Sequence, residues 1–283
     1  MTGHSRPARV LFNGVIGGLM VVALWTFGVA AARAHEFFID AEPFVVPSGG
    51  VLTASLRVGE DFEGAAQAYL PPNFRRFDVV MGGQVVPVAG RAGDRPALNM
   101  PAPRDGLAVV VHVTRDYRLT YTNWSKFERF VTHKDAVWVL QAHQDRELNT
   151  DRVVERYSRY GKSLIAVGDG GGADASVGLL TEIVAEANPY TDPGLSVMPV
   201  KVLYQGQPRK DAQVEIFAKT AEGLVTVSTV RTDDTGRAQV PVVAGSRYLL
   251  DAVVLRPLAV DSLKDPTWES LWASLTFAVP ARR

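Results

Sequence analysis

The most concentrated potential for chemistry lies at His35, which directly follows Ala32-Arg33-Ala34. Small residues at the first and last positions of this triplet are typical of a signal-peptidase cleavage site. If the chain is cut after Ala34, the α-amine of His35 becomes free beside its imidazole. These two nitrogens can hold one transition-metal ion together, because imidazole is a good ligand and an α-amine loses its proton near pH ~8. The sequence therefore predicts a metal ligand at the mature N-terminus.

Further histidines of the mature chain could complete a site of three nitrogens. His133 and His143 lie in a region with helical periodicity. On one straight helix they would be rotated by about 80° from a shared face. One of them alone could reach His35, or both could if the helix breaks near His133. We take His35, His133 and His143 as candidate metal ligands, and a surface or capping role remains the alternative for the last two. His112 lies in a strand, where we expect a structural role.

Acidic residues could add oxygen ligands near the predicted N-terminus. Glu36 is adjacent to His35, but consecutive residues of a strand point to opposite faces. Glu60, Asp61 and Glu63 form an acidic loop that lacks the spacing of a calcium-binding loop. We expect these three side chains to be solvated.

Composition and missing motifs exclude several classes of protein. The absence of cysteine excludes disulfides, thiolate metal sites and a lipid anchor at the cleavage point. The patterns Gly-x-Ser-x-Gly and His-Glu-x-x-His are also absent, which argues against a serine hydrolase and a zinc protease. The leader holds three of the 30 basic residues and no acid, so its removal leaves 27 basic against 30 acidic residues. This balance offers no basic face for nucleic acid.

Residues 1–34 have the organisation of an export signal. A positive segment with Arg6 and Arg9 precedes an apolar run over residues 11–32. This run is long enough to span a bilayer, so an uncleaved membrane anchor remains the alternative. Both interpretations place the body of the protein outside the cytoplasm. An exported chain without disulfides suits the periplasm, and it would contact the membrane only through an uncleaved leader.

Hydrophobic alternation predicts a mainly β fold of two β-sandwich-like domains. The apolar face of one strand is formed by Leu107, Val109, Val111 and Val113. Residues 188–194 have the composition of a linker, and about seven short strands follow, which is typical of an immunoglobulin-like sandwich. We expect an N-terminal domain over residues 35–187 and a C-terminal sandwich over residues 188–283.

The hydrophobic period changes to that of a helix at about residues 125–161. Residues 126–145 favour one helix, and Asn149 or Thr150 is a suitable N-cap for a second helix over residues 151–160. The N-terminal domain should therefore carry a short helical insertion. Insertions on a rigid scaffold are frequent places for functional sites.

Several segments together resemble a known bacterial family. They are Ala-His-Glu-Phe-Phe-Ile-Asp at residues 34–40, Leu-Arg-Val-Gly-Glu at residues 56–60, Val-Leu-Tyr-Gln-Gly-Gln-Pro at residues 202–208 and Trp-Ala-Ser-Leu-Thr-Phe at residues 272–277. The chain resembles an exported domain-of-unknown-function family that is often labelled as the periplasmic component of nickel-uptake systems. Its C-terminal part resembles the carboxypeptidase-regulatory β-sandwich. The resemblance implies an exported protein that handles nickel or cobalt, with His35 in the opening motif.

We thus expect a non-enzymatic periplasmic protein that binds a transition-metal ion and supports its uptake. Nickel is the favoured metal, copper or cobalt is possible, and a membrane metal transporter is a possible partner. One alternative is a copper-dependent oxidative enzyme that uses the same N-terminal histidine brace. The other is a non-catalytic interaction module of the cell envelope.

Overall fold

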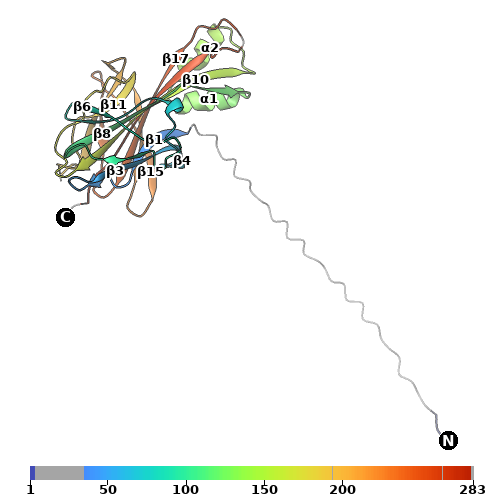
Figure 1. Cartoon of the computed structure of the whole chain (residues 1–283). Helices are drawn as coiled ribbons and strands as arrows, with labels where there is room; N and C mark the ends of the chain where they lie inside the picture. Colours follow the sequence, from blue (N-terminus) through green and yellow to red (C-terminus); the bar gives the residue numbers. More distant parts are fainter. Residues whose placement is uncertain (4–34, 193, 263, 282–283) are drawn as a thin grey trace. The chain divides into compact units, whose positions relative to one another are not determined.

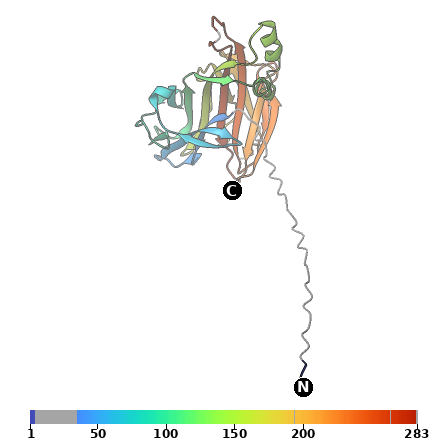
Figure 2. The same cartoon turned by 90° about the vertical axis from the view of Figure 1, so that its right-hand side faces the viewer.

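The computed structural model describes residues 1–3, 35–192, 194–262 and 264–281 (Figures 1 and 2). The described residues from 35 onward belong to one compact unit. Apart from its first three residues, the expected leader with its cut after Ala34 lies outside the described residues. Within the described part of the chain, no helix has the length and apolar character needed to cross a bilayer.

The prediction of a mainly β fold is confirmed, and the described strands form three sheets. The first sheet contains β1 (Glu36–Ala41), β3 (Val51–Glu60), β4 (Glu63–Gln67) and β7 (Leu98–Pro101). The third contains β11 (Thr181–Ala185), β12 (Val197–Tyr204), β13 (Gln207–Pro208) and β16 (Arg237–Pro241).

The second sheet is the largest and has ten strands among the described residues. Its main path runs through β15 (Val225–Arg231), β14 (Gln213–Lys219), β17 (Arg247–Pro257), β18 (Trp268–Ala278), β10 (Val153–Val167), β8 (Gly106–Thr114), β5 (Phe74–Met81) and β6 (Gln84–Pro87). β2 (Val45–Val46) and β9 (Tyr117–Tyr121) also pair with β10.

This large sheet is covered on both faces, so it serves two hydrophobic cores. On β8, Val109 faces the core beneath β11 and β12, whereas Ala108 and Val110 face the core beneath β1 and β3. The side chains of β10 also alternate between the two cores: Leu164 lies in the core beneath β11 and β12, and Ile165 in the core beneath β1 and β3. Two β-sandwich layers therefore share one central sheet.

The apolar face predicted for residues 107–113 of β8 is confirmed. All four predicted residues lie in the core beneath β11 and β12. The opposite face of β8 is buried as well, because β1 and β3 cover it. A strand buried on both faces reads as a continuous apolar run rather than a strict alternation, and the run Ala-Val-Val-Val at residues 108–111 fits that description.

The helical insertion is shorter than predicted. Residues 126–145 form two helices, α1 (Trp124–His133) and α2 (Trp138–Asp145), rather than one. The chain reverses between them at Asp135, which has a φ of 55°. Both helices pack on β9, β17 and β18 through a third cluster that includes Phe127, Val131 and Trp268.

The second helix predicted over residues 151–160 is wrong, since this segment begins β10. The Asn149 side chain does accept the backbone N–H groups of Asp151, at 2.6 Å, and Arg152, at 3.3 Å. This side chain closes a turn before a strand rather than capping a helix, and both uses have the same sequence signal. Pairing with β9 on one side and β18 on the other then fixes the segment as a strand.

The expected division into domains at residues 187 and 188 does not match the structure. β11 and β12, on either side of that boundary, are antiparallel neighbours. β17 and β18 belong to the same sheet as β10 and β8. Residues 33–283 are therefore one structural unit, in which the two sandwich layers have a common sheet.

A shared sheet predicts that both cores unfold together. Leu52, in the core beneath β1 and β3, and Leu250, in the core beneath β11 and β12, are both fully buried. We expect Leu52→Ala and Leu250→Ala each to lower the free energy of unfolding by about 2–5 kcal/mol. In urea denaturation followed by fluorescence, each variant should shift one common transition.

The exposed residue Leu224, which is 65% accessible, supplies the control. Leu224→Ala should change the free energy of unfolding by no more than about 0.5 kcal/mol. A Leu52→Ala variant that showed a separate early transition, with the second transition unmoved, would contradict the shared-sheet interpretation.

Candidate functional site

His35 directly precedes β1, at the end of the first sheet where β3 finishes. Glu36 pairs with Gly59 in the β1–β3 register, which places His35 next to Glu60. The His35 side chain is 62% exposed, and its Nδ1 lies 3.5 Å from Oε1 of Glu60. The imidazole is therefore accessible to an ion from solvent and already stands beside a carboxylate.

The turn that carries the acidic residues is rigid. Asp61 and Phe62 connect β3 to β4 and have φ values of 51° and 60°, as in the tight hairpin turns that need two left-handed residues. Burial of Phe62 against Phe38, with ring centroids 5.1 Å apart, offsets the backbone cost. The guanidinium carbon of Arg247 also lies 5.9 Å from the centre of the Phe62 ring. The position of Glu60 and Asp61 is thus fixed by packing.

A small acidic pocket of about 100 Å³ adjoins this turn. Its lining comes from β1, the β3–β4 turn, the end of α1, β14 and β15, and consists of Glu36, Glu60, Asp61, His133, Glu215, Phe217 and Val227. Four of these side chains are carboxylates. Of the three acidic residues expected to be solvated, Glu63 has 76% of its side chain exposed. Glu60 and Asp61 line the pocket.

Lys134 lies buried beneath the pocket, directly after α1. Its Nζ is 3.2 Å from Oε1 of Glu36 and 3.0 Å from Oδ2 of Asp251, and it also donates to Oε2 of Glu215. The side chain is 2% exposed, and the ammonium stands 4.7 Å from the ring centre of Trp272. One ammonium thus ties the helical insertion to β1, β14 and β17.

The charges of this cluster do not balance, because three carboxylates surround one lysine. Burial raises the pKa of Glu36 to about 7, against the opposing effect of Lys134. Burial likewise raises the pKa of Asp251 to about 6. Burial alone would lower the pKa of Lys134, but Asp251, Glu215 and Glu36 outweigh it and raise that pKa. The cluster consequently favours any additional positive charge, whether a proton or a cation.

His133 belongs to this pocket, as its last position in α1 brings it next to β14. Its Nε2 lies 2.9 Å from Oε1 of Glu215, and its side chain is 41% exposed. His35 and His133 thus each contact a carboxylate that lines the pocket, His35 that of Glu60 and His133 that of Glu215.

His143 is placed elsewhere and does not fit the expected role of ligand. It is fully buried, and both ring nitrogens are engaged: Trp268 Nε1 donates to Nδ1 at 3.0 Å, and Nε2 lies 3.3 Å from the carbonyl oxygen of Asn149. The ring packs against Trp124 with centroids 4.9 Å apart. Burial lowers the pKa of His143. We therefore correct the predicted ligand set by removing His143.

His112 occupies the structural position expected of it. Its ring lies among those of Phe37, Phe74 and Phe77, with centroids 5.0–5.3 Å away. Burial lowers its pKa to about 3. Within the described residues, no three His, Asp or Glu side chains are grouped as a complete set of metal ligands. The candidate ligands His35, His133 and His143 are thus not brought together in one site within the described residues.

The residues that sequence reasoning missed are Lys134, Glu215 and Asp251. Glu215 lies 81 residues and Asp251 lies 117 residues from Lys134 along the chain, so no local sequence pattern connects the three. The only available signal was a charged lysine directly after an apolar helix face, and that is ordinarily a solvated position.

Comparison with known proteins gives a family description without an activity. A protein-family profile described as "domain of unknown function (DUF4198)" matches residues 32–256. No curated protein matches the sequence. Among solved structures, the D0-D1 domain of Intimin is similar at 14% sequence identity and a TM-score of 0.22, covering 86% of this chain and 97% of that one. A TM-score this low supports no statement about fold or function.

The raised pKa of Glu36 predicts a specific dependence of stability on pH. The folded chain holds a proton on Glu36 between pH 4.5 and about 7, where an unfolded chain has lost it. Stability from this group is therefore full below pH 4.5 and is lost as the pH rises through about 7. Over that window Glu36 should lower the free energy of unfolding by up to about 3 kcal/mol.

Glu36→Gln should reduce this decline, measured as the free energy of unfolding in urea at a series of pH values. The decline should not vanish, since Asp251 titrates in the same direction. Glu63→Gln, which alters an exposed acid on the neighbouring hairpin, should leave the curve unchanged. Identical curves for Glu36→Gln and the unmodified protein would rule out this assignment.

Proposed function

The chain belongs to the DUF4198 family of unknown function, and we propose that it is an exported protein that binds a transition-metal ion at its mature N-terminus. The observation that carries the proposal is the exposed imidazole of His35 beside Glu60, at the rim of the acidic pocket. Removal of the leader after Ala34 would add the α-amine of His35 as a second nitrogen donor. The metal is cargo in this proposal, and the protein is not an enzyme.

Two described side chains and the new amine would make three donors. The His35 imidazole and amine supply nitrogen, and Glu60 supplies oxygen, a combination that suits nickel, copper or cobalt. His133 could join only by exchanging its contact with Glu215 for the metal. His143 has no place in the site, because both of its nitrogens are engaged within the hydrophobic cluster.

The electrostatics of the pocket support a cation as ligand. Glu36, Glu60, Asp61 and Glu215 line it, and the buried ammonium of Lys134 balances only part of their charge. An approaching cation would be attracted by this excess of carboxylates. Nickel remains the favoured cargo, and delivery to a membrane transporter would be the corresponding role in the periplasm.

If the free α-amine is a ligand, metal affinity should differ between the chain that begins at His35 and the chain that retains Ala34. The chain that begins at His35 should bind one equivalent of Ni²⁺ or Cu²⁺ in isothermal titration calorimetry. Retaining Ala34 blocks the amine and should weaken binding by at least about tenfold, equal to about 1.4 kcal/mol. His35→Ala should abolish binding, and metal should raise the melting temperature only of proteins that bind it.

Glu63→Gln provides a matched control, since it removes an acid from the same hairpin but not from the pocket. Its affinity for metal should equal that of the unmodified protein, whereas Glu60→Gln should bind more weakly. Equal affinity with and without Ala34 would refute the proposed role of the amine.

A further inference from the structure

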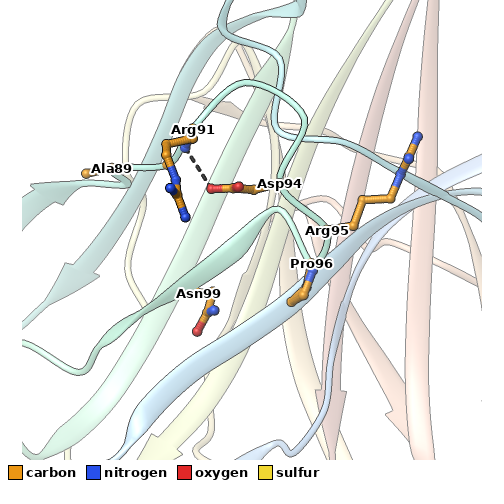
Figure 3. A pocket seen from close by; sticks show the side chains of 7 residues that line it. Ala89, Arg91, Asp94, Arg95, Pro96 and Asn99 are labelled. Atoms are coloured by element: carbon orange, nitrogen blue, oxygen red, sulfur yellow. Dashed lines mark hydrogen bonds between the residues drawn. The ribbon is translucent and has the colours of Figure 1, made fainter.

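A second pocket lies in the connection between β6 and β7, near the end of β3 opposite His35. Its volume is about 490 Å³, and it is lined by Ala89, Gly90, Arg91, Asp94, Arg95, Pro96 and Asn99 (Figure 3). Asn99 in β7 pairs with Thr53 of β3, whereas His35 adjoins Glu60 at the far end of that strand. The volume is within the range of pockets that hold small molecules.

The loop that forms this pocket is held by Tyr69. The Tyr69 N–H donates to the Asp94 carbonyl at 3.0 Å, and the Gly93 N–H donates to the Tyr69 carbonyl at 2.9 Å. The Tyr69 hydroxyl donates to the carbonyl of Val88 at 3.1 Å. Its ring also covers Gly90, where a Cβ atom would stand only 3.0 Å from it. The loop is therefore rigid without a ligand.

A short turn within the loop positions Arg91. The Arg91 N–H donates to Oδ2 of Asp94 at 2.7 Å, and the Asp94 N–H donates back to the Arg91 carbonyl at 3.0 Å. Asp94 therefore engages the backbone of Arg91 and not its side chain. Among the described residues, no carboxylate forms an ion pair with the Arg91 guanidinium. Figure 3 shows this side chain directed toward Asn99, whereas Arg95 extends away from both.

We propose that this pocket binds a small anion that carries hydroxyl groups, with Arg91 pairing its carboxylate or phosphate. The planar guanidinium donates two parallel hydrogen bonds to such an oxyanion. Asn99 offers both a donor and an acceptor, and the Asp94 carboxylate can accept from a hydroxyl group. Because the loop is already fixed by Tyr69, binding requires little ordering of the protein.

Calorimetric titration of the purified full chain, stripped of metal, tests this proposal with citrate, glucose 6-phosphate and glucose. At least one of the two anions should bind saturably with one equivalent per chain, and neutral glucose should not bind. Citrate alone would identify the ligand as a hydroxylated carboxylate, and glucose 6-phosphate alone as a hydroxylated phosphate. Absence of saturable binding by either anion would overturn the proposal.

Arg91→Ala and Arg95→Ala remove the same charge from the same loop and form a matched pair. Arg91→Ala should weaken binding by at least about tenfold, and Arg95→Ala by less than about twofold. Arg91→Lys should fall between Arg91→Ala and the unmodified chain, because lysine lacks the planar fork. Equal losses in the two alanine variants would indicate general attraction of anions and refute the site. His35→Ala should leave anion binding unchanged, which separates this test from that of the metal site.

Discussion

The structure depends on the pairing of β10 with strands from both halves of the chain. β10 runs parallel to β18 through residues 155–163 and antiparallel to β8 and β9 on its other edge. Parallel strands in one sheet need a long connection between them, and here that connection contains the whole of the third sheet. Both faces of the β10 end that includes Leu164 and Ile165 are covered. Displacing β10 would therefore open two cores at once.

Two buried lysines fasten peripheral segments to this central sheet, and they differ in one respect. Lys162 of β10 contacts Asp174 and Glu182, and these two carboxylates also accept the backbone N–H groups of Ala185 and Val177. That group of charges is fully enclosed and has a structural role. Lys134 contacts the buried Asp251 and also Glu36 and Glu215, which line a solvent-accessible pocket. Only the second arrangement leaves negative charge where an ion can approach, although buried ion pairs as such contribute little to stability.

Sequence reasoning succeeded where the signal is local and periodic. The apolar face of β8 and the helical period of α1 follow from residue spacing alone. It failed at residues 151–160, because a side chain such as Asn149 closes turns and caps helices with the same hydrogen bonds, and the choice is made by distant strands. Part of the candidate site could be named from the sequence, namely His35 and His133. The neighbourhood of Lys134 was not, because long-range strand pairing alone brings Asp251 to it.

The location of β18 has a consequence for how this protein is made. The segment Trp268–Ala278 fills the position between β17 and β10, in the middle of the largest sheet. A nascent chain that has reached only residue 260 would lack the strand that joins β17 to β10, and the core beneath β11 and β12, which includes Leu271 and Leu275, could not close. Contacts between such distant segments form slowly. Closure of that core must therefore wait until the last strand of the chain has been made.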